Sequence, residues 1–383
     1  MSLPPRPPPA LLDDLVELVL LRVPPDDPAS LVRASLVCKL WRRLISGNRF
    51  RRRYREFHHS PPMLGFFYHK LSGAIRFLAT SSFRPPRAYR SNWHAMDARH
   101  GRIVFRVSTT TEDRMLMVSN PVTGDERWLP VPDLAGHYGC ATWNVAVVCA
   151  AAGCDHVDCP SGGPFTLVFL GSQVLDKITA ACTYSSKTGS WGQTISVEHS
   201  EGYVAHCSVL VGNMLHFILR LSNQILEYDL DKQEISVIDP PSSSQAVWAA
   251  PITTKDDRLG IAMYEEPNLC IWSREAGLNG DAEWVQQRVF ELDKLLPAGA
   301  LQISPLFCGT VGNSCVIFMG TLDGLFAIDL KSGRVTRKLL EDYDICDIVP
   351  YMSFCIPSTS TPPGKQAADR GCGEETDCRF LPV

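Results

Sequence analysis

The sequence predicts an α+β protein in two parts, a small helical unit followed by an all-β propeller of about six blades, with seven as the alternative count. Three observations favour this fold class. Before residue 60, apolar residues recur with the period of a helix. After it, they form short β-rich runs between Gly, Asp, Asn and Ser. A hairpin-like pattern then begins at residues 69, 120, 185, 229, 273 and 329, a spacing typical of four-stranded blades. A β-sandwich is the structural alternative for the second part.

Length, charge and cysteine content exclude several classes of protein. The chain has 383 residues and a formal net charge of −4, so no overall field points to nucleic acid or a membrane. The longest apolar run, 145–152, is far shorter than the roughly 20 residues that span a bilayer. The proline-rich start is not arranged like a signal peptide. Its 14 cysteines lack framework spacing, so we expect reduced thiols and a cytoplasmic or nuclear protein.

Four segments are expected along the chain. Residues 1–8 are predicted to be a disordered lead and residues 358–383, rich in Ser, Thr, Pro and Gly, a disordered tail. The helical unit is expected at 9–58 and the propeller at 59–357.

The first helix is expected at 12–22, with Pro24 and Pro25 ending it. One apolar stripe along it contains Leu12, Leu15, Val16, Val19 and Leu20. Leu18 and Leu21 lie outside that stripe, so the helix is apolar on two sides.

A second helical region is expected after Ser30, which is suited to cap it. Its apolar positions include Val37, Leu40, Trp41, Leu44 and Ile45. Gly47 is a suitable helix end, and a short basic helix is expected at 50–57. A unit of this size is marginally stable alone, so its surplus apolar surface requires a partner or the body of the same chain.

The helical stretch resembles an F-box, the module that binds the Skp-type adaptor of cullin–RING ubiquitin ligases. The resemblance rests on Leu11-Leu12-Asp13-Asp14-Leu15, on 19–24, and on 30–42 with its Val-Cys-x-x-Trp run. The family usually has proline where this chain has Leu12. The resemblance implies that a set of side chains supplies adaptor contacts or their immediate support. They are Leu11, Leu12, Leu15, Val19, Leu20, Val37, Trp41 and Leu44.

Strands are expected in the body at 63–68, 102–107, 116–119, 215–219, 226–228, 270–272, 316–319 and 325–328. In the recurring pattern, Asp, Asn or Ser opens a turn and Gly takes the position with positive φ. The six copies are 69–73, 120–124, 185–189, 229–233, 273–277 and 329–333, and the copy at 229–233 has Gln233 in place of glycine. We expect Trp128, Trp191 and Trp284 to pack between neighbouring sheets, and 345–356 to close the ring against the first blade.

The body also resembles the F-box-associated or kelch-like propellers of plant F-box proteins. This weaker resemblance rests on 97–107, on 119–130 with its Ser-Asn-Pro-Val-Thr-Gly start, and on 213–230. Together the two resemblances imply the substrate-recognition subunit of an SCF-type ubiquitin ligase, without catalytic residues of its own. The target protein and the residues that bind it are unknown.

One group of cysteine and histidine residues is compatible with a metal site. Cys149, Cys154, His156 and Cys159 lie in 136–164, which is expected to be a blade with a long, partly mobile loop, and their spacing is compatible with zinc. We favour ordinary thiols in an insertion, and so expect no metal and no cofactor.

Two other function classes stay open. An enzyme on the propeller scaffold would need a deep polar pocket with converging carboxylates. A nucleic-acid binder would use the basic cluster Arg49, Arg51, Arg52, Arg53 and Arg55. A solvated helix face is the simpler interpretation of that cluster.

Overall fold

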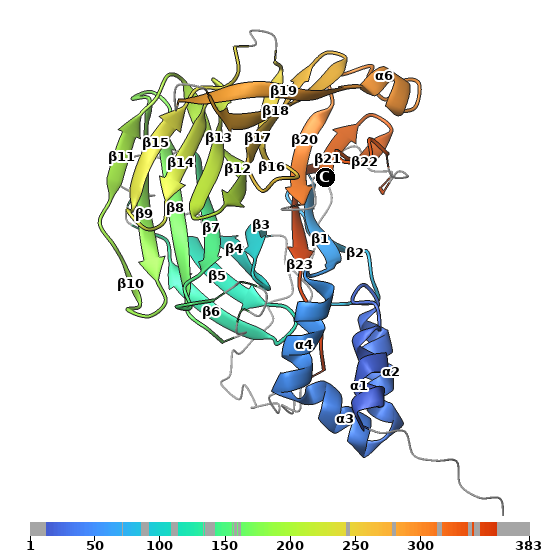
Figure 1. Cartoon of the computed structure of the whole chain (residues 1–383). Helices are drawn as coiled ribbons and strands as arrows, with labels where there is room; N and C mark the ends of the chain where they lie inside the picture. Colours follow the sequence, from blue (N-terminus) through green and yellow to red (C-terminus); the bar gives the residue numbers. More distant parts are fainter. Residues whose placement is uncertain are drawn as a thin grey trace, which may run out of the picture.

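The computed structural model describes residues 13–70, 72–85, 92–108, 114–132, 134, 142–154, 156, 159, 162–242, 246–277, 281–311, 316–335, 339–340 and 345–357. Four N-terminal helices lie beside a ring of antiparallel sheets (Figure 1). The predicted lead, 1–8, and tail, 358–383, fall outside the described residues. None of the helices in this part of the chain is long and apolar enough to cross a membrane.

The helical unit contains α1 (Asp13–Leu21), α2 (Pro28–Val37), α3 (Lys39–Ser46) and α4 (Asn48–His58). The predicted second helical region is broken, because Cys38 has extended backbone and its Sγ accepts the Trp41 N–H at 3.5 Å. The predicted cap at Ser30 is wrong. Asp27 is the residue before α2, and Ser30 Oγ donates to its carboxylate at 2.6 Å. Gly47 follows the end of α3 as expected.

Six sheets make up the body in the described part of the chain, and we number them as blades. Blade 1 contains β1 (Met63–Lys70), β2 (Ile75–Ala79) and β23 (Ile345–Met352). Blade 2 contains β3 (Trp93–Arg99), β4 (Arg102–Ser108), β5 (Arg114–Asn120) and β6 (Asp125–Pro130). Blade 3 contains β7 (Thr142–Cys149), β8 (Phe165–Gln173), β9 (Ile178–Ser185), β10 (Ser190–Trp191) and β11 (Ile195–Glu198).

Blade 4 contains β12 (Gly202–Val211), β13 (Met214–Leu221), β14 (Ile225–Asp229) and β15 (Glu234–Ile238). Blade 5 contains β16 (Trp248–Thr253), β17 (Leu259–Glu265), β18 (Asn268–Ala276) and β19 (Ala282–Glu291), after which comes the short helix α6 (Leu292–Leu295). Blade 6 contains β20 (Leu306–Val311), β21 (Val316–Thr321) and β22 (Gly324–Asp329). The eight strands expected from sequence all fall within these strands.

The ring closes through its innermost strands. The inner strands β3, β7, β12, β16, β20 and β23 contact one another in that order, and β23 contacts β3. β23 also pairs with β1, from Met63 opposite Met352 to Lys70 opposite Ile345. The C-terminal strand therefore completes the first blade, as predicted, and the body is a six-bladed propeller rather than a sandwich.

Most copies of the turn pattern have the predicted geometry. At 120–124, 185–189, 229–233 and 329–333, the N–H of the fifth residue donates to the carbonyl of the first at 2.8 Å. The opening side chain accepts backbone N–H groups, as Asn120 Oδ1 does from Val122 and Thr123. Gln233 adopts φ of 56°, the position held by glycine in the other three turns. The copy at 273–277 is wrong, because β18 continues through these positions to Ala276.

Two of the three predicted tryptophans join neighbouring blades. Trp191 Nε1 donates to the Pro130 carbonyl at 3.2 Å, and Trp284 Nε1 to the Asp239 carbonyl at 2.8 Å. The prediction for Trp128 is wrong, because its side chain is 45 % exposed and its ring lies edge-on to Trp93 in the same blade.

The segment 136–164 is not a single loop. Residues 135–141 lie outside the described part, and β7 occupies 142–149, so that only the connection from Ala150 to Pro164 separates β7 from β8. The Ala150 N–H donates to the Pro164 carbonyl at 3.0 Å and closes the base of that connection.

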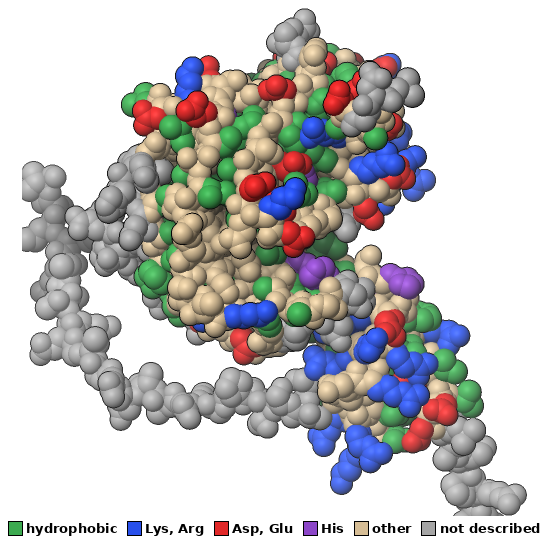
Figure 2. Space-filling model, turned by 60° about the vertical axis from the view of Figure 1, so that its left-hand side comes forward, with side chains coloured by type: hydrophobic (Ala, Val, Ile, Leu, Met, Phe, Trp, Pro, Cys, Tyr) green, Lys and Arg blue, Asp and Glu red, His purple; other side chains and the backbone are tan. Residues whose placement is uncertain are grey.

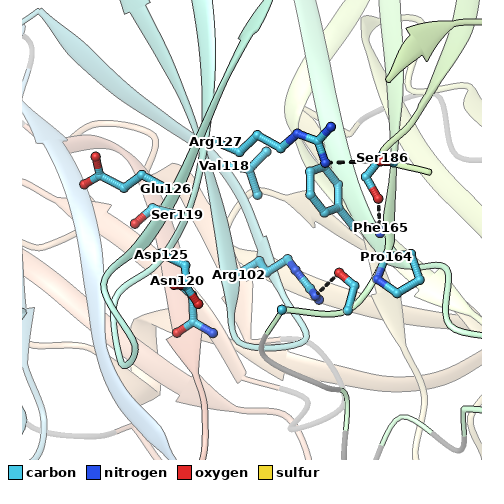
Figure 3. A pocket seen from close by; sticks show the side chains of 12 residues that line it. Arg102, Val118, Ser119, Asn120, Asp125, Glu126, Arg127, Pro164, Phe165 and Ser186 are labelled. Atoms are coloured by element: carbon cyan, nitrogen blue, oxygen red, sulfur yellow. Dashed lines mark hydrogen bonds between the residues drawn. The ribbon is translucent and has the colours of Figure 1, made fainter. Parts of the chain in front are cut away.

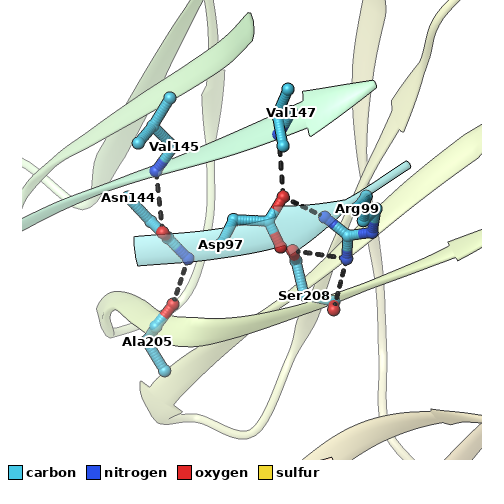
Figure 4. A network of polar contacts seen from close by, with 7 residues as sticks. All are labelled: Asp97, Arg99, Asn144, Val145, Val147, Ala205 and Ser208. Carbon is cyan, nitrogen blue, oxygen red and sulfur yellow. Dashed lines mark hydrogen bonds and ion pairs between the residues drawn. The ribbon is translucent and has the colours of Figure 1, made fainter. Parts of the chain in front are cut away.

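A buried polar network joins the inner strands of blades 2, 3 and 4 (Figure 4). The Asp97 carboxylate accepts the Val147 N–H at 2.7 Å and is ion-paired with Arg99. Arg99 also donates to the Ser208 carbonyl at 2.6 Å. Burial raises the pKa of the Asp97 carboxyl, while Arg99 and the Val147 N–H act in the opposite direction. The ion pair thus offsets part of the solvation that this carboxylate loses.

Substitution of Arg99 should destabilise the folded protein. We expect Arg99→Met to lower the free energy of unfolding by about 3–5 kcal/mol, because a buried carboxylate loses its counter-charge. Asp97→Asn should cost less, since the amide oxygen can still accept the Val147 N–H. In Arg99→Met the loss should be present above the folded-state pKa of Asp97 and shrink as the pH falls through it, because the carboxyl is then neutral. Urea unfolding across a pH series measures this, and a wild-type pH profile for Arg99→Met would contradict it.

The turns at 120–124 in blade 2 and 229–233 in blade 4 are equivalent, but the fifth residue is glycine in the first and glutamine in the second. Substitutions in opposite directions at these two positions can therefore be compared. Gly124 has φ of 79° with open space around its missing side chain, and Gln233 is exposed at φ of 56°. We expect Gly124→Ala to lower the free energy of unfolding by about 1 kcal/mol, and Gln233→Gly to raise it by up to about 1 kcal/mol. Chemical denaturation measures both changes, and the same sign for the two would refute the proposed equivalence.

Candidate functional site

The first helix has two apolar faces, and only one is buried. Val16, Leu20 and Leu21 lie in the helical core, and Leu20 is only 2 % exposed. Leu15, Leu18 and Val19 face outward, and Val19 is 62 % exposed. The single stripe predicted from sequence therefore mixed residues from both faces.

The second helix adds exposed apolar residues. Val32 and Leu36 are one turn apart on α2, and Val37 follows at its end with an exposure of 64 %. Leu31 of the same helix and Ile45 of α3 are buried in the core. Among the described residues we call the exposed set on the two helices the docking face. It consists of Leu15, Leu18, Val19, Val32, Leu36 and Val37.

The residues predicted to contact an adaptor fall into three groups. Leu15, Val19 and Val37 belong to the docking face. Leu20 is buried, and Trp41 and Leu44 are half-buried against the helical core, so these three can support the face from beneath. Leu11 and Leu12 lie outside the described residues.

Sequence reasoning did not assign Leu18, Val32 and Leu36 to the site. The spacing of Val32 and Leu36 by four residues was the available signal, because it puts both on one side of a helix. Figure 2 shows such hydrophobic side chains at the surface of the helical unit among Lys and Arg.

The core beneath the docking face includes residues from the opposite end of the chain. Phe354 and Ile356, which follow β23, are buried in the same cluster as Leu20 and Phe50. The Phe354 ring lies edge-on to Tyr54 with centroids 6.1 Å apart. The helical unit thus docks in part on its own body, while the docking face stays outside that contact.

Polar contacts fix the helices beneath the docking face. Arg53 Nη1 of α4 lies 2.7 Å from the buried Glu17 carboxylate of α1, and Tyr54 Oη donates to the Val23 carbonyl at 2.7 Å. Burial raises the pKa of the Tyr54 phenol, so Tyr54 keeps its proton and remains a donor. Ser82, after β2, donates to the Asp27 carboxylate at 3.0 Å and joins the start of α2 to blade 1.

The basic cluster is partly neutralised by its neighbours. Arg53 is paired with Glu17, and Arg52 lies 2.8 Å from Glu56. Burial lowers the pKa of Arg55 to about 10, an effect to which Arg51 adds. Arg49 is exposed. These side chains therefore do not form an array of free cations.

A pocket of about 340 Å³ opens between blades 2 and 3 (Figure 3). Arg102 donates to the Gly163 carbonyl at 2.7 Å and Arg127 to the Ser186 carbonyl at 3.1 Å. Both guanidinium groups also lie within 6 Å of the Phe165 ring. The two arginines thus fasten blade 3 to blade 2.

The carboxylates at this pocket are not arranged as a catalytic pair. Asp125 accepts the Thr123 hydroxyl at 2.7 Å. Glu126 is directed away from Phe165 (Figure 3). The converging carboxylates that the enzyme hypothesis needs are not found at this pocket.

Fold and surface define a two-part protein, a helical unit with an exposed apolar face and a propeller joined to it. Residues 10–53 match the model of the F-box domain. The chain therefore has an F-box domain followed by a six-bladed β-propeller-like body. F-box domains in general bind Skp-type adaptors in cullin–RING ligases, and F-box proteins are generally non-catalytic substrate receptors.

Two solved structures have low similarity to this chain. One is a functionally unknown protein from Desulfotomaculum acetoxidans DSM 771, with a TM-score of 0.46 and 10 % identity over 76 % of this chain and 88 % of that one. The other is in the nidogen–laminin complex, with a TM-score of 0.43 and 11 % identity over 76 % of this chain and 99 % of that one. A search of curated proteins gave no match. The assignment of the body as a propeller rests on its own strand pairing.

The contact between Phe354 and the helical core can be tested directly. We expect Phe354→Ala to lower the free energy of unfolding by about 3–5 kcal/mol, since it leaves a cavity between α4 and the segment that follows β23. Phe57→Ala on α4 is a matched control, because Phe57 is half-exposed and its loss leaves no cavity. Denaturant unfolding compares the two, and equal effects would show that Phe354 contributes no special packing.

Proposed function

We propose that this chain is the substrate-recognition subunit of an SCF-type cullin–RING ubiquitin ligase. The docking face of the F-box domain binds a Skp-type adaptor, and the propeller binds the target protein. The chain itself is non-catalytic, and ubiquitin transfer belongs to the conjugating enzyme that the assembled ligase recruits. We expect this complex in the cytoplasm, the nucleus or both.

The docking face is the observation that carries this proposal. It presents six large apolar side chains on α1 and α2 of a unit that already has its own core. Exposed large apolar side chains on a small unit are characteristic of protein interaction sites. Its position within the matched residues 10–53 supports an adaptor as the partner.

The attachment of the propeller supports the second half of the proposal. Phe354 and Ile356 pack into the helical core, and Ser82 joins blade 1 to the start of α2. A target held by the propeller would therefore have a restricted position relative to the adaptor. Such restriction raises the effective concentration of the target near the conjugating enzyme. The resemblance to F-box-associated or kelch-like propellers of plant proteins is consistent with this arrangement.

We assign the basic cluster a structural role rather than nucleic-acid binding. The ion pairs of Arg52 and Arg53 with carboxylates on the helices favour this interpretation. Binding to nucleic acid would instead fall steeply with rising salt.

Adaptor binding is tested with a double variant that keeps the helices intact. Val19 lies in the last turn of α1 and Val37 ends α2, so lysine at either site is compatible with the helix dipole. We expect Val19→Lys/Val37→Lys to weaken binding to a Skp-type adaptor at least thirtyfold. This factor corresponds to about 2 kcal/mol, the binding free energy lost when one interface hot spot is removed. Calorimetry or co-purification measures the change.

Leu175→Lys is the matched control, because Leu175 is 95 % exposed on the propeller, away from the docking face. It should leave adaptor binding unchanged. A double variant with the thermal transition of the wild type and undiminished adaptor binding would refute the docking face. We prefer these substitutions to Trp41→Ala, since Trp41 packs on the helical core and its loss could act through unfolding.

A further inference from the structure

The connection between β7 and β8 gathers three cysteines and a histidine. Cys149 is the last residue of β7, where it pairs with Phe165 of β8. The chain then turns back, with Gly153 at φ of 66° and the Cys154 N–H donating to the Ala151 carbonyl at 3.3 Å. His156 and Cys159 complete the group, which we call the cysteine cluster. Residues distributed over 11 positions of the chain thus come together at one point.

The ligand atoms of the cysteine cluster have the separations of a tetrahedral site. One atom from each of the four residues lies within 4.8 Å of all the others. Cys154 Sγ and Cys159 Sγ are 3.7 Å apart, and Cys159 Sγ lies 3.6 Å from His156 Nδ1. With Zn–S of about 2.3 Å and Zn–N of about 2.0–2.1 Å, tetrahedral zinc separates sulfur pairs by about 3.8 Å and S–N pairs by about 3.6 Å. The thiols are far beyond the roughly 2.0 Å of a disulfide.

We propose that Cys149, Cys154, His156 and Cys159 form a structural zinc site. Three sulfurs and one imidazole nitrogen are a soft donor set suited to zinc, and four protein ligands leave no position for substrate. Spacing alone favoured ordinary thiols in an insertion. The folded positions of the four ligand atoms lead to the opposite interpretation.

The surroundings of the cluster suit a site of negative charge. Zinc with three thiolates carries a net charge of −1, and Arg55 of α4 is close enough to Cys159 for the two charges to interact. His100, from the β3–β4 turn, has Nδ1 3.4 Å from Cys159 Sγ. An N–H at that nitrogen would donate to the coordinated thiolate, as polar groups around metal ligands commonly do.

The zinc would hold together two neighbouring blades of the propeller. It fixes the β7–β8 connection of blade 3, which Arg102 of blade 2 already contacts through the Gly163 carbonyl. His100 brings the β3–β4 turn of blade 2 to the same point. This role is independent of adaptor binding, so the two proposals can fail separately.

Metal content of the full chain tests the proposal. We expect about one zinc per chain by inductively coupled plasma mass spectrometry after purification without added metal or chelator. His156→Asn should reduce zinc occupancy at least tenfold. Asparagine suits position 156 because His156 is exposed at φ of 60°, a region that asparagine tolerates. His156→Cys should retain zinc, because it replaces one zinc ligand with another.

Cobalt substitution gives a second measurement that identifies the ligands. The wild-type protein loaded with Co²⁺ should show the visible and thiolate charge-transfer bands of a tetrahedral site, and these should shift in His156→Cys. Cys38→Ser, which changes an exposed cysteine of the F-box domain, should retain both zinc and spectrum. Absence of stoichiometric zinc together with absence of thiolate–cobalt bands would overturn the proposal. Full zinc retention in a Cys154→Ser/Cys159→Ser variant would do the same.

Discussion

The pairing of β23 with β1 is the interaction on which the rest of the structure depends. It joins segments from opposite ends of the described chain and places β23 innermost, in contact with β3 on one side and β20 on the other. The chain then continues without interruption to Phe354 and Ile356 in the helical core. The same segment, β23 and the residues that follow it, therefore closes the ring and packs against the F-box domain. Loss of this pairing would open the ring and also free the segment that carries Phe354 and Ile356.

This arrangement gives the F-box domain two different surfaces. The inner surface is satisfied within the chain, where Leu20, Phe50 and Tyr54 meet Phe354. The outer surface is the docking face, whose six apolar side chains are exposed. A small helical unit would be marginal with its own few core residues. The contribution from the C-terminal segment stabilises it without using the docking face, so the proposed adaptor binding would not compete with the core for the same side chains.

Local features of the fold were predictable from sequence, and non-local ones were not. Asn120 and Gly124 specify their turn through short-range hydrogen bonds and positive φ, so the pattern identified it correctly. Ser273 and Gly277 fit the same pattern, but pairing of β18 with β19 continues the strand from Ser273 to Ala276 in place of the expected turn. In α1, Val19 and Leu20 are adjacent and equally apolar, and only the packing of α4 and Phe354 decides which is buried. The Cys149–Cys159 spacing likewise predicts no geometry until the β7–β8 connection has folded back.

The β3–β4 turn links these separate features. His100 contacts Cys159 of the cysteine cluster, and the adjacent Gly101 carbonyl accepts the Tyr351 hydroxyl of β23 at 3.1 Å. A side chain at position 101 would meet Ser353 Oγ at 3.2 Å, so glycine allows the chain after β23 to pass close to this turn. Because the chain after β23 passes this turn and then enters the helical core, the turn, the cluster and the closing strand all lie near the boundary between propeller and F-box domain. A rigid cluster at this boundary would limit movement of the F-box domain, in addition to the packing of Phe354 and the contact of Ser82 with Asp27. The orientation of a bound target relative to the adaptor would then depend on the cluster as well as on these contacts.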